Sequence, residues 1–381
     1  MRVKLSEEQN LLRDSVRRFA EEVIKPHAKE IDESGEFPRD LFDQAGELGL
    51  AGVTIPEQYG GAGMDTVSYC LVIEEISRVC ASNGVILSVN NSLVCDPLLV
   101  FGTEEQKEKF LTPLASGKQL GCFALTEPQA GSDPSALRTL AKRDGDDYIL
   151  NGNKLFITNG TDADIALVFA TVDPEKRHKA ITAFVVSADT PGYSHGGHEW
   201  KLGVNASGTT ELAFQDMRVP ASQRLGEEGD GFKIAMASLD GGRVGIAAQA
   251  VGIAQGAFEE ALAYAQEREQ FGRAIAEFQA IQFYLADMST EIDAARFLTW
   301  KAAWAKDTQK RYTLEAAQAK LFSSEMAQKV TNKALQIHGG YGYIREYNVE
   351  RFFRDARITE IYEGTSEIQK LVIADWVLEH S

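Results

Sequence analysis

The hydrophobic periodicity of the chain changes twice, and these changes constrain the fold more than any other feature. Through the first third, apolar residues recur every three or four positions, which predicts amphipathic helices. From about 121 to 225 the pattern alternates or forms short runs of β-branched and aromatic residues, which predicts strands. From 232 onward the chain is helical again. We predict a mainly α protein with a central β-domain, divided at 1–120, 121–228 and 229–381.

Local signals place several elements within this outline. Ser6 with Gln9, and Thr103 with Gln106, have the spacing of helix-starting capping boxes. Long Ala-rich segments at about 232–267, 278–306 and 314–338 predict antiparallel helices packed as a bundle. The central strands are expected near 148–150, 154–158, 165–172, 181–186 and 212–214. We expect Asn151-Gly152-Asn153 to be a hairpin turn and the strands to form a small antiparallel barrel or sandwich.

Composition excludes several classes of protein. The net charge is -17 without a cluster of Lys and Arg, which argues against binding to nucleic acid. No stretch approaches 18 uncharged apolar residues, so we expect no membrane span, and the N-terminus enters a helix without a signal segment. The four cysteines, at 70, 80, 95 and 122, form no C-x-x-C pair and are expected to be reduced core residues. Reduced cysteines favour a cytoplasmic location. His195 and His198 lack a third ligand nearby, so we predict no metal site.

Two central segments have the residue types that bind a flat polar ring. In 123–133 an apolar strand end is followed by Thr126 and Ser132, whose hydroxyls and neighbouring backbone N–H groups suit a heterocycle or a phosphate. Phe156 and Thr158 are two residues apart, so in a strand both point to one face. Neither G-x-G-x-x-G nor a Walker A sequence occurs, which makes a parallel nucleotide-binding fold unlikely.

A candidate general base lies near the C-terminus. Glu363 stands between Ile361-Tyr362 and Gly364-Thr365, just before helical periodicity resumes. A carboxylate there, beside a glycine that permits close approach of another molecule, suits proton abstraction. A solvated glutamate in an interhelical turn fits the same local pattern. Two opposing effects act on the pKa of this carboxyl group. The helix start favours the carboxylate and lowers the pKa, whereas desolvation by apolar neighbours raises it.

Five motifs together identify a family. The turn ALTEPQAGSD, the strand FITNG, and the segments RE-x-FG, QIHGGYGY and IYEGTSEIQ occur in this order. Along essentially its whole length, the chain resembles the acyl-CoA dehydrogenase family, and most closely its short-chain, butyryl-CoA-type branch. The resemblance implies a helical N-terminal domain, an antiparallel β-barrel or sandwich and a C-terminal four-helix bundle. It also implies FAD-dependent α,β-dehydrogenation of acyl-CoA to trans-2-enoyl-CoA.

The resemblance assigns roles to particular residues. Glu363 matches the catalytic base, and its backbone N–H matches a donor to the thioester carbonyl. FAD would be bound by Phe123, Leu125, Thr126, Gly131, Ser132, Phe156, Ile157, Thr158, Arg268, Phe271, Gln279, Gln336, Gly339, Gly340, Thr365 and Glu367. The acyl-CoA would contact Ser132, Asp240, Arg243 and Gly364. In this family the 268–279 and 336–340 residues serve FAD across a subunit interface, which implies a homotetramer built as a dimer of dimers. Electron-transferring flavoprotein is the implied electron acceptor.

Two departures from related branches narrow the substrate. Isovaleryl- and long-chain relatives carry their base at the position of Gly242, where a glycine cannot act. The glutaryl branch uses an arginine in the helix corresponding to 84–100, and no basic residue occurs there. A short, uncharged, straight acyl chain is therefore the expected substrate.

Four alternatives remain at this level. An acyl-CoA oxidase-like flavoprotein usually has an additional C-terminal domain, and a nitroalkane-oxidase type uses an aspartate base. Some bacterial relatives run as enoyl-CoA reductases. A non-catalytic helical scaffold would be expected to lose the base or the flavin turns, and the chain retains both.

Overall fold

The computed structural model describes residues 4–379, and its first third is helical, as predicted. Both capping boxes are formed. The α- and π-helices of this part are α1 (Glu7–Phe19), η1 (Ala20–Ile24), α2 (Ala28–Ser34), α3 (Arg39–Glu47), α4 (Thr66–Ser77), α5 (Ala81–Ser88), η5 (Val89–Cys95), α6 (Asp96–Phe101), α7 (Glu104–Gln106), η6 (Lys107–Leu111) and α8 (Thr112–Ala115). The four cysteines are free and buried.

The segment from α5 through α6 is more apolar than we expected from the sequence. By length and composition, Ala81–Phe101 is a candidate membrane span, but 78% of its most apolar window is buried inside the protein. Its middle part, η5, has π-helical geometry. This segment is a core helix, packed against α4, α9 and the start of the sheet.

The central part is an eight-stranded sheet with the order β6-β7-β3-β2-β4-β5-β8, and β1 pairs with β4. Most pairings are antiparallel, whereas β1–β4 and β2–β4 are parallel. The strands are β1 (Gly121–Ala124), β2 (Leu140–Asp144), β3 (Asp147–Ile157), β4 (Ile165–Thr171), β5 (Ile181–Ser187), β6 (Tyr193–His195), β7 (Thr210–Pro220) and β8 (Arg224–Leu225).

The predicted hairpin turn at Asn151-Gly152-Asn153 is wrong. β3 runs through these residues as one strand, with an irregularity in its pairing to β7 between Leu150 and Gly152. Gly152 is needed for another reason: it has a φ of 147°, and a Cβ there would lie 2.6 Å from Thr139 Oγ1. The hairpin turn instead joins β2 to β3 around Gly145, which has a φ of 63°.

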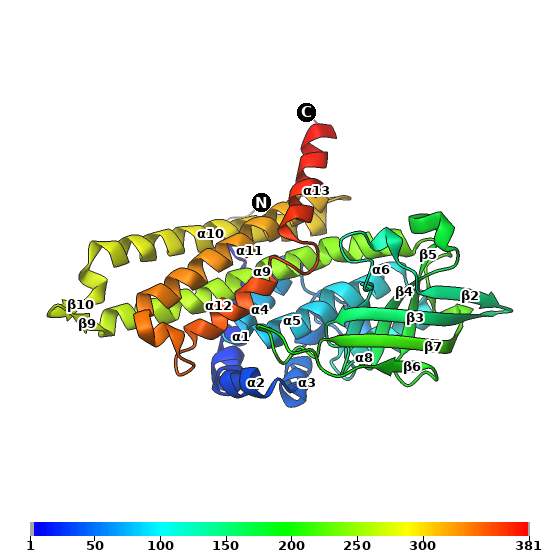
Figure 1. The fold of residues 1–381 in the computed structure, drawn as a ribbon, viewed down its shortest axis with the longest axis horizontal. Coiled ribbons are helices and arrows are strands. Elements are labelled where there is room, and N and C mark those ends of the chain that lie inside the picture. Colours follow the sequence, from blue (N-terminus) through cyan, green and yellow to red (C-terminus); the bar gives the residue numbers. More distant parts are fainter. Residues whose placement is uncertain (1–3, 380–381) are drawn as a thin grey trace.

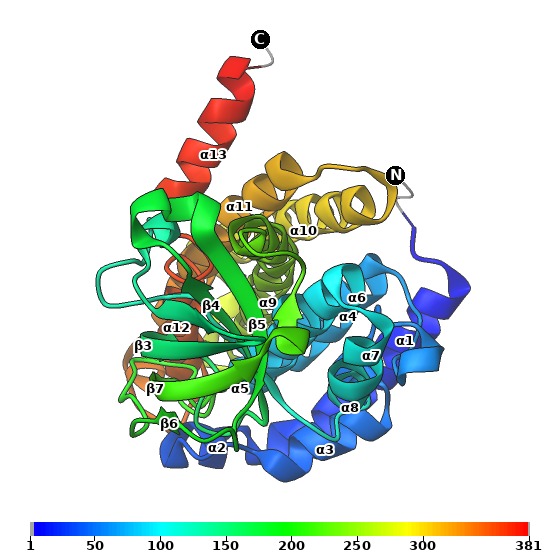
Figure 2. The same ribbon diagram turned by 90° about the vertical axis from the view of Figure 1, so that its right-hand side faces the viewer.

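The last part is a helix bundle, as predicted, made of α9 (Gly231–Glu267), α10 (Gln279–Thr308), α11 (Thr313–His338) and α12 (Val349–Ile358). α9 is its central helix and lies between the sheet and the N-terminal helices (Figure 2). A Cβ at Gly256 would lie 2.1 Å from the Arg78 carbonyl oxygen, so this glycine permits close packing after α4. α13 (Ser366–Glu379) projects from the body, and the β9–β10 hairpin (Glu269–Gln270, Arg273–Ala274) lies at the bundle end away from the sheet (Figure 1).

Candidate active site

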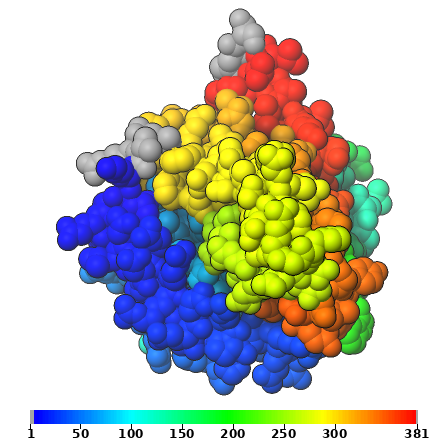
Figure 3. All heavy atoms as spheres, turned by 90° about the vertical axis from the view of Figure 1, so that its left-hand side faces the viewer, coloured from blue at the N-terminus to red at the C-terminus, as the bar shows by residue number. Residues whose placement is uncertain are grey.

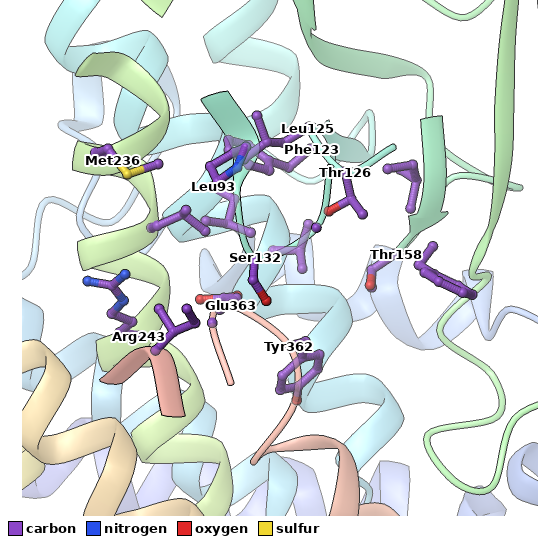
Figure 4. A pocket seen from close by; sticks show the side chains of 18 of the residues that line it. Leu93, Phe123, Leu125, Thr126, Ser132, Thr158, Met236, Arg243, Tyr362 and Glu363 are labelled. Atoms are coloured by element: carbon purple, nitrogen blue, oxygen red, sulfur yellow. The ribbon is translucent and has the colours of Figure 1, made fainter. Parts of the chain in front are cut away.

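Two adjoining cavities open where the sheet meets α9 and the 361–365 turn. The inner cavity, of about 190 Å³, extends between η5 and α9, and the outer cavity, of about 520 Å³, extends toward the C-terminal end of α12. Figure 4 shows the inner cavity, with Met236 and Arg243 projecting from α9 and Thr158 standing beyond the end of β3. Residues that line both cavities are Thr126, Gly131, Ser132, Phe156, Thr158, Tyr362, Glu363 and Gly364.

Glu363 lies in a strained turn between the two cavities. Its φ is 52°, a conformation that non-glycine residues rarely adopt, and Gly364 follows with a φ of 95°. The Oε2 atom is buried and has no hydrogen-bond partner among the described residues. Burial raises the pKa of Glu363 to about 8, although the charges of Lys320 and Arg243 act to lower it. The effect of desolvation on this pKa therefore outweighs that of the two neighbouring basic residues.

Two buried side chains fasten this turn from outside the cavities. Lys320 Nζ donates to the Gly364 carbonyl at 2.8 Å, and Gln369 Nε2 donates to the Gly364 and Glu363 carbonyls at 2.9 and 3.2 Å. Burial lowers the pKa of Lys320 to about 7, and the Glu363 carboxylate opposes this effect. The Tyr362 hydroxyl is anchored on Gln249 of α9.

Gly242 on α9 faces the carboxyl group of Glu363. A Cβ at Gly242 would lie 2.0 Å from Glu363 Oε2 and 2.8 Å from Leu93 Cδ2. A side chain at 242 and the Glu363 carboxylate therefore compete for one space. This geometry fits the expectation that relatives place a base at either position and that Gly242 leaves the role to Glu363.

Asp240 and Arg243 lie one helical turn apart on α9 and form a buried ion pair, with Arg243 Nη1 2.7 Å from Asp240 Oδ1. Thr313 Oγ1 donates to the other Asp240 oxygen at 2.6 Å. Burial raises the pKa of Asp240 despite the neighbouring Arg243 charge. Arg243 lines the inner cavity, and its Nε is buried without a partner among the described residues.

A buried ion pair orders the 125–132 segment. Lys154 Nζ on β3 lies 2.7 Å from Glu127 Oε1, and these side chains are 0% and 3% exposed. The Glu127 carboxylate also accepts the backbone N–H groups of Arg138 and Thr139, while Lys154 donates to the Leu125 carbonyl. These contacts fasten the turn that carries Thr126 and Ser132 into both cavities.

Phe156 and Thr158 line the same cavities. From the sequence, we expected both on one face through regular strand alternation, but the strand is irregular here. Phe156 has a φ of 57°, where the pairing of β3 with β7 becomes irregular. Its ring is 62% exposed, which is unusual for a phenylalanine beside a cavity. An open aromatic face next to the Thr158 hydroxyl is suited to a conjugated ring.

Sequence reasoning missed the apolar wall of the inner cavity. Val85 on α5 and Val89 and Leu93 on η5 form one side, and Met236 and Leu239 on α9 contribute the other. It also missed Lys320 and Gln369. The signal for Lys320 was present, because it is a single cation among Ala and Ser on the buried face of α11. Further residues of the outer cavity that were missed are Lys201, Arg354 and Arg357.

The remaining predicted cofactor residues form a second group, remote from Glu363 in this chain. Arg268, Gly339 and Gly340 line a separate cavity at the bundle end that carries β9 and β10 (Figure 1). Figure 3 shows the segments near 270 in yellow-green and near 340 in orange on one face of the molecule. Phe271, with 95% of its surface exposed, Gln279 and Gln336 are exposed there as well. Thr365 lines the outer cavity, and Glu367 is exposed at the start of α13.

Comparisons with known proteins agree with this arrangement. Family models for the acyl-CoA dehydrogenase N-terminal, middle and C-terminal domains match residues 6–118, 122–217 and 229–378. The chain is 52% identical to a short-chain-specific acyl-CoA dehydrogenase of Clostridium acetobutylicum, covering 98% of this chain and 99% of that one. It superposes on butyryl-CoA dehydrogenase of Megasphaera elsdenii with a TM-score of 0.97 at 47% identity, covering 99% and 100% of the two chains. A structure from work on the electron transferring flavoprotein of Acidaminococcus fermentans gives a TM-score of 0.98 at 49% identity, with coverage of 99% and 100%. The chain belongs to the acyl-CoA dehydrogenase family.

Proposed function

We propose that the protein is an FAD-dependent acyl-CoA dehydrogenase that converts short-chain acyl-CoA thioesters to trans-2-enoyl-CoA, with Glu363 as its base. The observation that carries the assignment is the carboxyl group of Glu363, a residue that lines both cavities and whose Oε2 atom is buried without a partner among the described residues. A carboxylate held without a structural partner in an apolar pocket is poised for proton transfer. The division at 1–120, 121–228 and 229–381 and a cytoplasmic location stay predictions.

The residues around the outer cavity fit FAD. The exposed Phe156 ring offers a face for the conjugated ring system, and Thr126, Ser132 and Thr158 offer hydroxyl groups. A Cβ at Gly131 would meet nothing within 4 Å, so open space adjoins that backbone. When bound, FAD supplies the acceptor that takes the β-hydrogen of the substrate together with its bonding electrons.

The residues of this chain perform the proton chemistry. Glu363 must be ionised to accept the α-proton, so its raised pKa makes it a stronger base than an exposed glutamate. The proton then lies on a Glu363 carboxyl oxygen. Negative charge builds on the thioester oxygen during this step and requires hydrogen-bond donors, of which we propose the Glu363 backbone N–H as one. The apolar walls of the inner cavity exclude water from this site.

The inner cavity supports a short, uncharged acyl chain. The residues that α5 and η5 contribute to it, Val85, Val89 and Leu93, are all apolar. A carboxylate at the far end of a dicarboxylic acyl chain would therefore be desolvated beside them without a counter-ion. We propose that the thioester enters the inner cavity from the side where Arg243, its partner Asp240, and Ser132 lie.

The second group of cofactor residues supports assembly from several copies. Arg268, Gly339 and Gly340 line one cavity, separate from those that Glu363 lines. Phe271 lies between β9 and β10, at the bundle end away from the sheet (Figure 1), Gln279 begins α10, and Gln336 lies in the last turn of α11. If they bind FAD, they must reach the FAD of another subunit. We propose a homotetramer built as a dimer of dimers, with electron-transferring flavoprotein as acceptor. The likeness to the structure from the Acidaminococcus fermentans work supports the acceptor.

The test is reduction of the bound flavin by thioesters. The purified protein is mixed without oxygen with butyryl-, octanoyl-, isovaleryl- or glutaryl-CoA while its visible absorbance is recorded. We expect butyryl-CoA to bleach the flavin fastest and glutaryl-CoA to be the poorest substrate. A colourless protein, or a flavin that no thioester bleaches, would refute the assignment. Rapid reoxidation by air would instead favour an oxidase.

A further inference from the structure

Lys320 approaches the Glu363–Gly364 turn from α11. Its side chain is 0% exposed, and its Nζ donates to the Gly364 carbonyl at 2.8 Å. Burying an ammonium group is costly unless its charge and N–H donors are used. The neighbouring buried residues of α11 are small, namely Ala316, Ala319, Ser323 and Ser324. The cation is therefore directed at the turn and not at a partner on its own helix.

The turn needs such support because its backbone is strained. Glu363 has a φ of 52° and Gly364 a φ of 95°. A non-glycine residue persists in this region only where its surroundings hold it there. Two side chains do so, since Lys320 and Gln369 both donate to the Gly364 carbonyl.

We propose that Lys320 is a positioning residue for the dehydrogenation: it holds the Gly364 carbonyl so that the Glu363 carboxylate faces the inner cavity. This inference rests on the proposed function of Glu363 as the base. Lys320 acts through the turn, and it is not itself placed among the groups that touch the reacting atoms.

Several charged or titratable groups surround the pair. α9 contributes Arg243 and its partner Asp240, α4 contributes Tyr69, the turn itself contributes Tyr362, and α13 contributes Glu367. Lys320 and Arg243 both lower the pKa of Glu363, with Lys320 having the larger effect. Because burial lowers the pKa of Lys320 to about 7, the inference depends on its hydrogen bond to the Gly364 carbonyl, which a neutral amine also donates, and not on its charge.

Three substitutions separate the charge of Lys320 from its hydrogen bond. Lys320→Gln removes the charge and keeps an N–H donor, Lys320→Met removes both, and Lys320→Arg keeps both. Lys329→Gln, on the exposed face of the same helix, is the matched control. The pH dependence of kcat/KM reports ionisation in the free enzyme. Hydrogen exchange of residues 361–366 reports on the turn independently of turnover, and the flavin content and circular dichroism of each variant are recorded.

We expect Lys320→Met to lose about tenfold in the kcat/KM plateau and to show faster exchange in 361–366, because it has no donor for the Gly364 carbonyl. Lys320→Gln, whose N–H donor is on a side chain one bond shorter, should show exchange between that of the wild type and that of Lys320→Met. Lys320→Arg and Lys329→Gln should keep the wild-type plateau. If Lys320→Met does not fold, the exchange of 361–366 in Lys320→Gln decides the question.

Unchanged exchange in a folded Lys320→Met, or in Lys320→Gln if Lys320→Met does not fold, would overturn the inference. Glu363→Gln, measured alongside, separates this outcome from a failure of the proposed function. If Glu363→Gln turns over like the wild type, Glu363 is not the base. If it is inactive while the Lys320 variants match the wild type, only the role of Lys320 is refuted.

Discussion

Replacing Gly242 by alanine should disable the enzyme while leaving its fold intact. Real Cβ atoms essentially never approach another atom within 3.0 Å, and a Cβ at 242 would lie 2.0 Å from Glu363 Oε2. The carboxylate oxygen must therefore retreat by about 1 Å. The groups that must move are the ends of the Glu363 and Leu93 side chains, so the helix itself need not shift. A misplacement of about 1 Å at a reacting group can cost about 10²-fold in rate.

Gly241→Ala is the matched control, one residue earlier on α9. A Cβ at Gly241 would lie 3.6 Å from Lys306 Nζ and 3.7 Å from Asp96 Oδ2, which are ordinary contacts. Alanine in place of a helical glycine stabilises by about 0.5–1 kcal/mol. We expect Gly241→Ala to keep the wild-type kcat/KM with butyryl-CoA and to unfold at an equal or higher temperature. Gly242→Ala should lose about 10²-fold in kcat/KM and retain its flavin. Equal activity of the two variants would refute the argument that Gly242 makes room for the base.

Three further predictions follow from the site. Because the pKa of Glu363 is raised to about 8 and the carboxylate is the active form, kcat/KM should rise by about tenfold from pH 6 to pH 7 and level off above pH 8; a profile that is flat between pH 6 and pH 9 would contradict this. Lys154→Met leaves Glu127 buried without its cation and should lower the free energy of unfolding by about 3–5 kcal/mol, as measured by chemical denaturation. The double variant that adds Glu127→Gln should recover part of this loss. Phe156→Ala should reduce the flavin content of the purified protein and leave the melting temperature of the flavin-free protein nearly unchanged, because the ring is 62% exposed; full flavin retention would argue against Phe156 as a cofactor contact.

The sequence predicted the helical parts well because their signals are local. Ser6 and Gln9 specify a helix start through their own side chains, and the long Ala-rich segments at 232–267, 278–306 and 314–338 agree closely with α9, α10 and α11. The β-domain depends on distant contacts and was predicted less well. Gly152 was interpreted as a turn residue, whereas its conformation accommodates the close approach of Thr139 from the segment before β2. That approach involves a segment distant in sequence and is not visible around Asn151.

The motifs indicated several segments that the structure brings together around the two cavities, but the pKa of Glu363 required the structure. The sequence left open whether the helix start or desolvation controls the pKa of Glu363, and this depends on how completely the turn is buried. The supporting role of Lys320 was hidden for a similar reason. Lys320 is 43 positions from Glu363 in the sequence, and only the packing of α11 beside the turn shows their relation.

The most direct test of the account compares flavin reduction in the wild type and in Glu363→Gln. Both proteins are purified with their flavin and mixed rapidly with butyryl-CoA in the absence of oxygen, and the loss of visible flavin absorbance is followed. Removing a general base typically slows a reaction by about 10²–10⁴-fold. We predict that the wild type bleaches fully and that Glu363→Gln retains its flavin but bleaches at least about 10²-fold more slowly. Bleaching of Glu363→Gln at the wild-type rate would contradict the assignment of Glu363 as the base.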